Sequence, residues 1–172
     1  MKPLFEEKQR FTQWWLWAII VGASAISFGI FLNALYTQMV LGIPWGDKPM
    51  SDEALIIMVL FNLTAVVVML LIFFNSVLEV VVDKGGVSYR YFPLIRRWRR
   101  IERERIASFE TKEYYLRGHG LHIDLRGNKR ISVQGSSVIE FKLTDGKKLR
   151  LGTQQPGEFL IALDKMKKRS EN

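Results

Sequence analysis

Two long stretches without a charged residue dominate the pattern of hydrophobic and polar positions along the chain. The first lies between Arg10 and Asp47, and the second covers residues 54–78. Each is longer than the roughly 20 helical residues that cross a hydrocarbon core about 30 Å thick. A soluble domain in a chain of 172 residues has too small a core to bury both stretches. The pattern predicts two transmembrane helices, at residues 14–36 and 54–76.

The segments that flank these helices fit a hairpin in a membrane. Residues 1–13 are a short amphipathic lead-in, and residues 37–53 form a connection rich in Gly and Pro. Ser51, Asp52 and Glu53 are typical of a helix start. Aromatic side chains that favour the headgroup layer border the first span: Trp14, Trp15, Trp17, Tyr36 and Trp45.

The basic residues predict the orientation of this hairpin. The first span is longer than the apolar region of about 7–15 residues in a signal peptide, so we expect it to be retained. The connecting loop has a single Lys/Arg, Lys48, whereas the N-terminal tail has three and the segment after the second span has many. The positive-inside rule then places both termini in the cytoplasm. The expectation is a multi-pass protein of a bacterial inner membrane.

Small and polar residues inside the spans predict helix packing. Four small residues share one face of the first helix, because their spacing follows the helical repeat: Ala18, Gly22, Ala25 and Gly29. The simpler interpretation is packing against the second span, and the alternative is the contact surface of a homo-oligomer. Asn62 lies at about the depth of Ser27 in an antiparallel hairpin, which favours a structural hydrogen bond.

After the second span the pattern changes to short segments rich in β-branched and aromatic residues. Two tight turns are predicted, at Lys84-Gly85-Gly86 and at Asp145-Gly146. A final helix is predicted by Pro156 and by an apolar stripe that includes Phe159. Residues 77–172 thus form a cytoplasmic domain with seven strands and a closing helix. The strand-like segments are residues 77–83, 87–92, 105–113, 120–125, 129–134, 138–144 and 147–152.

The net charge of +8 belongs to this second part of the chain. Residues 1–78 carry 4 Lys and Arg against 5 Asp and Glu, whereas the rest carries 21 against 12. This asymmetry indicates an anionic partner such as a membrane surface, an acidic protein or nucleic acid. The chain has no cysteine, which excludes disulfides and thiol catalysis.

The densest basic segment follows the second span by about twenty residues, at positions 96–105. Basic clusters near a membrane are attracted to anionic headgroups by about 1 kcal/mol per charge, and Trp98 is suited to the interface. The alternative is that these arginines only set topology and solvate a loop between strands. Nucleic acid is disfavoured as a partner, because no base-reading module is present. The candidate binding residues are Lys84, Arg90, Arg96, Arg97, Trp98, Arg99 and Arg100.

Four segments of the second part of the chain stand out: GVSYRYFP at residues 86–93, RWRRI at 97–101, VQGS at 133–136 and DGKKLRLGTQQP at 145–156. Together they resemble the bacterial pleckstrin-homology-like (PH-like) domain proteins. The resemblance covers residues 77–168 and extends to the order of elements, a membrane hairpin followed by one domain. It implies an antiparallel β-sandwich or barrel with a C-terminal capping helix, and so an α+β membrane protein.

The resemblance does not extend to phosphoinositide recognition. Lys84 and Arg90 match the basic positions that phosphoinositide-binding PH domains place around their first hairpin, but Ser88 replaces a third. The family also implies no enzymatic activity, and fold alone does not establish function.

No catalytic constellation or phosphate-binding loop is apparent in the sequence. His119, His122 and Asp124 are too few for a metal site, so no metal or cofactor is expected. The leading hypothesis is a membrane-anchored interaction module, without enzymatic activity, that binds a protein, a peptide or anionic lipid headgroups. The alternative is an assembly subunit that forms homo-oligomers through the first helix. Transport is disfavoured, because neither span contains an ionisable residue.

Overall fold

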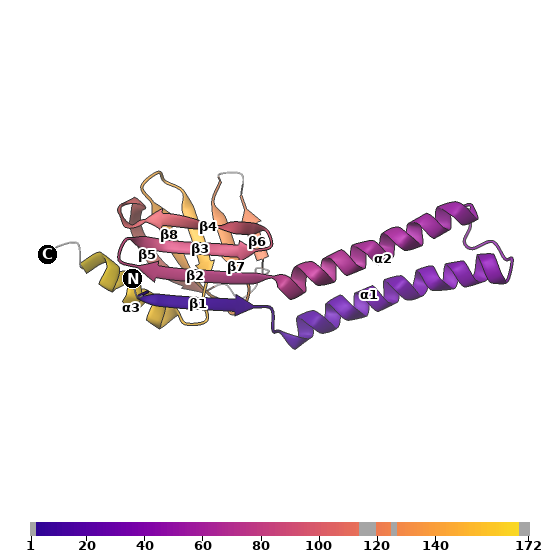
Figure 1. Cartoon of the computed structure of the whole chain (residues 1–172), viewed down its shortest axis with the longest axis horizontal. Helices are drawn as coiled ribbons and strands as arrows, with labels where there is room; N and C mark the ends of the chain where they lie inside the picture. The colour runs from indigo at the N-terminus through magenta and orange to yellow at the C-terminus, as the bar shows by residue number, and fades with distance from the viewer. Residues whose placement is uncertain (1–2, 114–119, 125–126, 169–172) are drawn as a thin grey trace. The chain divides into compact units, whose positions relative to one another are not determined.

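The computed structural model describes residues 3–113, 120–124 and 127–168, which divide into two compact units. A helical unit comprises residues 13–74. A β unit combines the N-terminal segment up to Thr12 with the chain from Asn75 onward (Figure 1). The β unit is therefore discontinuous in sequence, because the helical unit is inserted between its first two strands.

The helical unit contains two long apolar helices, α1 (Trp14–Leu35) and α2 (Asp52–Asn75). Helix α1 continues into a π-helical segment, Tyr36–Val40, so the helical chain extends four residues beyond the predicted end and the loop is shorter than 37–53. The resulting helices of 27 and 24 residues are long and apolar enough to cross a membrane. The predicted start of the second helix is confirmed, because the Ala54 amide donates to Ser51 Oγ over 3.3 Å.

The first sheet of the β unit has the strand order β1-β2-β3-β4, with antiparallel neighbours. Its strands are β1 (Phe5–Arg10), β2 (Val77–Asp83), β3 (Gly86–Phe92) and β4 (Ile95–Glu102). The predicted turn at Lys84-Gly85-Gly86 is confirmed between β2 and β3. Gly86 has a φ of +155°, and a Cβ there would lie 2.1 Å from the carbonyl oxygen of Ile101, so the turn requires glycine.

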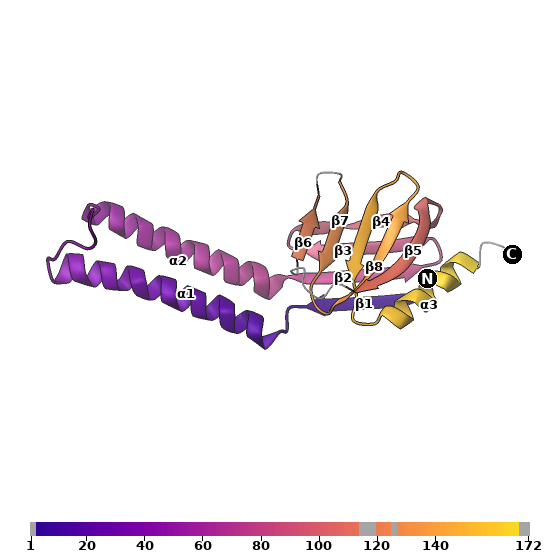
Figure 2. The same cartoon turned by 180° about the vertical axis from the view of Figure 1, so that it is seen from behind.

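The second sheet has the order β5-β8-β9-β7-β6. Its strands are β5 (Ile106–Glu113), β6 (Gly120–Ile123), β7 (Lys129–Ser132), β8 (Ser137–Leu143) and β9 (Lys148–Gly152). They run across the strands of the first sheet in both views of the molecule (Figures 1 and 2). The turn predicted at Asp145-Gly146 joins β8 to β9, and the Gly146 amide donates to the Leu143 carbonyl over 3.0 Å.

Two features of the predicted sheet were wrong. The described residues form nine strands rather than seven, because β1 and β4 were not expected. The sheets are also not wholly antiparallel, since β7 pairs with β9 in parallel. The lead-in at residues 1–13 therefore does not lie outside the β domain: residues 5–10 pair with β2 along their whole length.

A buried apolar core fills the space between the two sheets and the C-terminal helix α3 (Pro156–Lys168). The apolar stripe predicted for this helix is confirmed, because its members are all buried. Phe159 stacks on Phe5 of β1 with ring centroids 4.8 Å apart, and it also contacts Phe141 of β8. Other fully buried core residues are Leu78, Val80, Val82, Ile131, Ile139, Leu151 and Leu163.

Buried polar side chains of β1 link the first sheet to the end of β9. Gln9 Nε2 donates to the Gly152 carbonyl over 2.7 Å. The Glu7 carboxylate accepts from Thr153 Oγ1 over 2.6 Å and from the Gln154 amide over 2.8 Å. These bonds join the N-terminal strand to residues about 145 positions later in the chain, and so they connect the two sheets along one side of the sandwich.

Candidate anion-binding surface

The basic segment at residues 96–105 forms a strand and a short turn rather than the loop between strands that one of the two sequence interpretations assumed. Its arginines from Arg96 to Arg100 lie in β4, which is an edge strand of the first sheet. A 3₁₀ turn at Arg103–Arg105 then leads into β5. The register of β4 on β3 is irregular between Tyr89 and Tyr91. Charge and irregularity on an edge strand prevent pairing with other chains, which is one structural reason for this composition.

Arg100 is held by acidic residues of its own domain. Its guanidinium donates to both carboxylate oxygens of Asp83 over 2.7 and 2.8 Å, and to Glu102 over 3.1 Å. The hydrogen bond from Arg100 holds the pKa of the Asp83 carboxyl below its ordinary value, despite the opposing effect of burial. Arg100 therefore anchors β4 to the β2–β3 turn and is not free to bind a ligand.

Arg90 and Trp98 form a second internal cluster. Arg90 is ion-paired with Glu79, which also contacts Lys8 over 3.0 Å. The hydrogen bond from Arg90 is the main reason that the pKa of Glu79 lies below its ordinary value. The guanidinium carbon of Arg90 lies 4.9 Å from the centroid of the Trp98 ring, which places a cation on the indole face. Trp98 is nevertheless 47% exposed, so part of the residue still faces solvent.

The remaining candidate cations are exposed. Lys84, Arg96, Arg97 and Arg99 make no ion pair with a carboxylate among the described residues. The structure thus divides the seven sequence candidates into three that are internally engaged and four whose charges are available.

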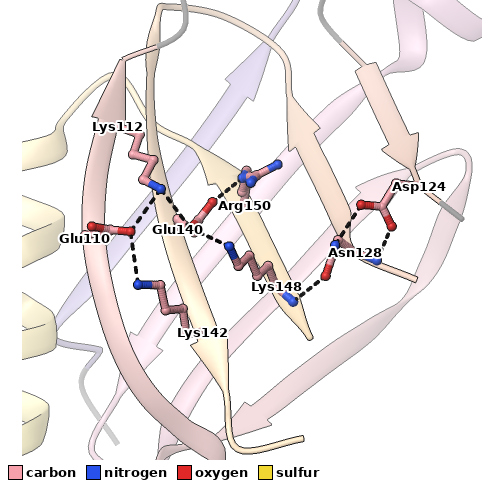
Figure 3. Close-up of polar contacts among 8 residues, drawn as sticks. All are labelled: Glu110, Lys112, Asp124, Asn128, Glu140, Lys142, Lys148 and Arg150. Carbon is pink, nitrogen blue, oxygen red and sulfur yellow. Dashed lines mark hydrogen bonds and ion pairs between the residues drawn. The ribbon is translucent and has the colours of Figure 1, made fainter. Parts of the chain in front are cut away.

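A charged network on the outer face of the second sheet was missed by the sequence analysis (Figure 3). Its centre is Glu140 of β8, whose side chain is fully buried. This carboxylate is paired with Arg150, with Lys112 over 3.0 Å and with Lys148 over 3.8 Å. Glu110 lies directly opposite Glu140, and Lys112 bridges the two because its Nζ is also 3.0 Å from Glu110. The alternation of charged and apolar residues in residues 137–143 was the available signal.

The cations of this network hold Glu140 in its charged form. Burial raises the pKa of Glu140, whereas the hydrogen bonds from Lys112 and Arg150 lower it. The lowering outweighs the effect of burial, so the pKa lies below its ordinary value of 4.5. Since the cations outnumber the two carboxylates, the outer face of the sheet keeps a positive balance.

A metal ion would need a suitable arrangement of the histidines and carboxylates of the described residues. Within residues 3–113, 120–124 and 127–168, no group of three or more His, Asp or Glu residues is arranged to hold a metal ion. His122 is an exposed residue of β6. His119 lies outside the described residues.

Of the residues predicted to pack the helices, Asn62 makes the expected contact and the small-residue face of α1 does not. Asn62 Nδ2 of α2 donates to Ser27 Oγ of α1 over 2.7 Å, which confirms the predicted hydrogen bond. The prediction that the small-residue face packs on α2 was wrong. A Cβ on Gly22 or on Gly29 would meet no atom within 4 Å, and Ala18 and Ala25 are exposed. The buried positions of α1 are instead Ile20, Ser24 and Ala34.

No protein-family model, no curated protein and no solved structure matches the chain. The structure shows an α+β arrangement of two sheets with a C-terminal helix. The resemblance to PH-like domains rests on the sequence segments.

Proposed function

We propose that the protein is a membrane-anchored interaction module, without enzymatic activity, that presents a basic PH-like domain at the cytoplasmic face of a bacterial inner membrane. The domain binds an anionic partner, either an acidic protein or peptide or the headgroups of anionic lipids. The observation that carries the proposal is the set of exposed cations without a carboxylate partner among the described residues: Lys84, Arg96, Arg97 and Arg99.

The exposure of the apolar helices supports the membrane anchor. Only 11% of the most apolar part of the first helix and 6% of that of the second is buried inside the protein. Apolar surface left in water costs about 25 cal/mol per Å², and large exposed side chains such as Ile26 and Phe61 contribute to it along the helices. A helix from the core of a soluble protein is buried, whereas a bilayer removes this cost.

The magnitude of the electrostatic attraction supports a binding role for β4. Each Lys or Arg near an anionic membrane contributes about 1 kcal/mol. Three of the four available cations, Arg96, Arg97 and Arg99, lie in β4 and together contribute about 3 kcal/mol. Arg96 and Arg97 are adjacent on an exposed edge strand, where a flat anionic surface or an acidic segment can reach both. Such an attraction falls steeply with ionic strength.

The lipid branch of the proposal is tested with the full-length protein in nanodiscs. Hydrogen exchange of β4 is compared in phosphatidylcholine and in phosphatidylglycerol-containing discs at low salt. We expect slower exchange with the anionic lipid, and we expect the difference to disappear in the double variant Arg96→Gln/Arg97→Gln. The variant Lys165→Gln/Lys168→Gln removes two exposed charges from α3 and serves as the matched control.

The protein branch is tested in native membranes with a photo-crosslinking residue in place of Trp98, which is part-exposed in β4. We expect a discrete crosslinked product that is lost when Arg96 and Arg97 are both replaced by Gln. If β4 shows neither lipid protection nor such a product, the proposed function is wrong.

A second candidate function is a structural subunit that assembles through α1. It is favoured by the small-residue face, which the second helix leaves open at Gly22 and Gly29. Such faces allow two helix backbones to approach closely in lipid. Chemical crosslinking of the full-length protein in membranes should then give oligomers that Gly22→Leu abolishes. Val21→Leu, on an exposed but different face, should leave them intact. Monomers of the unmodified protein would exclude this role.

A further inference from the structure

A cavity of about 210 Å³ opens at the mouth of the sandwich, where β4 approaches the start of β7 and the β8–β9 hairpin. Most of its charged lining is basic: Arg99, Arg100, Arg105, Lys129, Lys147 and Lys148. Asp145 is the single carboxylate among the residues that line it. The volume lies below the 300–1,000 Å³ that is typical for drug-sized ligands, so the cavity suits a small anionic group.

Two of these cations occupy strand positions that normally hold core residues. Arg99 is the register partner of Tyr89, whose side chain is buried in the sandwich. Lys129 is the register partner of Leu149, which is also buried. Register partners project to the same face of a sheet. Arg99 and Lys129 therefore lie on the inward faces of two different sheets.

The other four cations of the cavity are each ion-paired with a carboxylate of the protein. Arg100 is paired with Asp83, Lys148 with Glu140, and both Arg105 and Lys147 with Asp145. Arg99 and Lys129 have no carboxylate partner among the described residues. Arg99 is exposed and Lys129 is half-buried, so both charges remain accessible to a ligand. The cavity thus concentrates positive charge that its own acidic residue does not balance.

Besides the cations, the wall of the cavity contains apolar side chains and one hydroxyl that can donate a hydrogen bond. Its apolar residues are Ile101, Leu143 and Leu149, and Tyr89 lies among them. The Tyr89 hydroxyl has no hydrogen-bond partner among the described residues. Burial raises the pKa of Tyr89, so its hydroxyl is protonated at neutral pH and can donate. A ligand with an anionic head and a short organic portion matches this combination.

We propose that this cavity binds a phosphate group of a small molecule or a lipid headgroup, with Arg99 and Lys129 as the charged ligands and Tyr89 as a further donor. The guanidinium of arginine is suited to two parallel hydrogen bonds with phosphate oxygens, and a lysine adds a point charge. Arg99 is one of the four available cations named above, but Arg96 and Arg97 do not line the cavity, and a phosphate site that includes Lys129 and Tyr89 goes beyond the function proposed above.

Binding is tested by isothermal titration of the full-length protein in phosphatidylcholine nanodiscs, with inorganic pyrophosphate as the probe. We expect saturable binding at low salt that weakens as salt is added. Arg99→Gln and Lys129→Gln should each weaken the affinity by about tenfold or more, which corresponds to about 1.4 kcal/mol. Arg97→Gln removes an unpaired charge from the same strand outside the cavity and should leave the affinity unchanged.

Further variants protect the test against misfolding. Lys129→Arg keeps the charge and should retain binding, and thermal unfolding identifies any variant that has lost the fold. The proposal is overturned if the unmodified protein shows no saturable binding, or if Arg97→Gln weakens binding as much as Arg99→Gln. The double variant Arg96→Gln/Arg97→Gln separates the two proposals, because it should abolish the lipid response of β4 and leave pyrophosphate binding intact.

The same titration distinguishes the two sources of phosphate. Phosphatidylglycerol in the nanodiscs should compete with pyrophosphate if the natural ligand is a lipid headgroup. Unchanged affinity in those discs would instead identify a soluble phosphate compound as the ligand. Both results support a phosphate site, since each requires that Arg99 and Lys129 bind the probe.

Discussion

Glu140 shows how a charged residue on an outer sheet face can become part of the structure. Its side chain has no exposed surface, although the cations around it are 24–41% exposed. Arg150, Lys112 and Lys148 both shield the carboxylate from solvent and form ion pairs with it. These ion pairs compensate for the free energy that is lost when the carboxylate is removed from water. Removal of the carboxylate would leave the three cations to repel one another. The residue therefore specifies how β5, β8 and β9 align.

We expect Glu140→Gln to destabilise the β unit by about 1–3 kcal/mol at neutral pH, because the amide carries no negative charge and replaces one of the two acceptor oxygens with a donor. The pKa of Glu140 is lowered in the folded state, so its contribution is complete above the ordinary value of 4.5 and is lost as the pH falls through the folded value. The difference between the two proteins should shrink in acid. Urea unfolding across this pH range measures it, with the more exposed Glu110→Gln as control.

Asn62 and Ser27 offer a matching test inside the helical unit. Their hydrogen bond of 2.7 Å joins α2 to α1, and such bonds between membrane helices contribute about 0.6–2 kcal/mol. Asn62→Leu and Ser27→Ala should each weaken the association of the helices, and the double variant should cost no more than the larger single effect. A double-mutant cycle of unfolding in detergent measures this coupling, and simple additivity of the two changes would contradict the contact.

At the scale of elements, the contacts of β1 indicate that a fragment of the β unit needs this strand in order to fold. This strand completes the first sheet, and its buried residues Phe5, Glu7 and Gln9 contact α3 or the end of β9. A fragment that begins at residue 77 lacks all of these contacts. It would also leave β2 as an unprotected edge strand, which favours aggregation.

Phe5→Ala should destabilise the β unit by about 3 kcal/mol, because it removes an aromatic ring that is stacked on Phe159 in the core. Hydrogen exchange of β2 and α3 in the full-length protein should accelerate. Lys8→Ala, in the same strand but 54% exposed, should have little effect. Equal exchange in Phe5→Ala and the unmodified protein would mean that β1 is dispensable.

The turns and the helix with a clear local sequence pattern were predicted correctly, whereas the strands that contain polar or charged residues in place of alternating apolar ones were missed. The two turns were found because glycine is required at them, and α3 because its apolar stripe is regular. Strand β1 was missed because two of its three buried positions hold Glu7 and Gln9. Strand β4 was missed because arginines fill it. The parallel pairing of β7 with β9 depends on contacts across the chain, so no local pattern encodes it.

At the scale of the molecule, one insertion explains the unusual order of elements. The helical unit interrupts the β unit between β1 and β2, which are adjacent antiparallel strands. The end of β1 and the start of β2 therefore lie next to each other, because Arg10 pairs with Val77. A helical hairpin can connect these two strand ends without changing the register. If α1 and α2 cross a membrane, this connection requires both ends of the hairpin to leave it on the same side, as the distribution of basic residues also predicts.

The orientation of the hairpin can be measured cleanly, because the chain has no cysteine of its own. Lys48→Cys lies in the connecting loop and Lys165→Cys in α3, and both positions are exposed. In right-side-out spheroplasts, a membrane-impermeant maleimide should label Lys48→Cys directly, whereas Lys165→Cys should react only after the membrane is opened. The reverse pattern would place the β unit outside the cytoplasm, and it would remove cytoplasmic phosphate compounds and cytoplasmic-leaflet lipids as ligands of its basic sites. Labelling of both positions in intact spheroplasts would contradict a membrane hairpin altogether, because the loop and the β unit must then share one compartment without a bilayer between them.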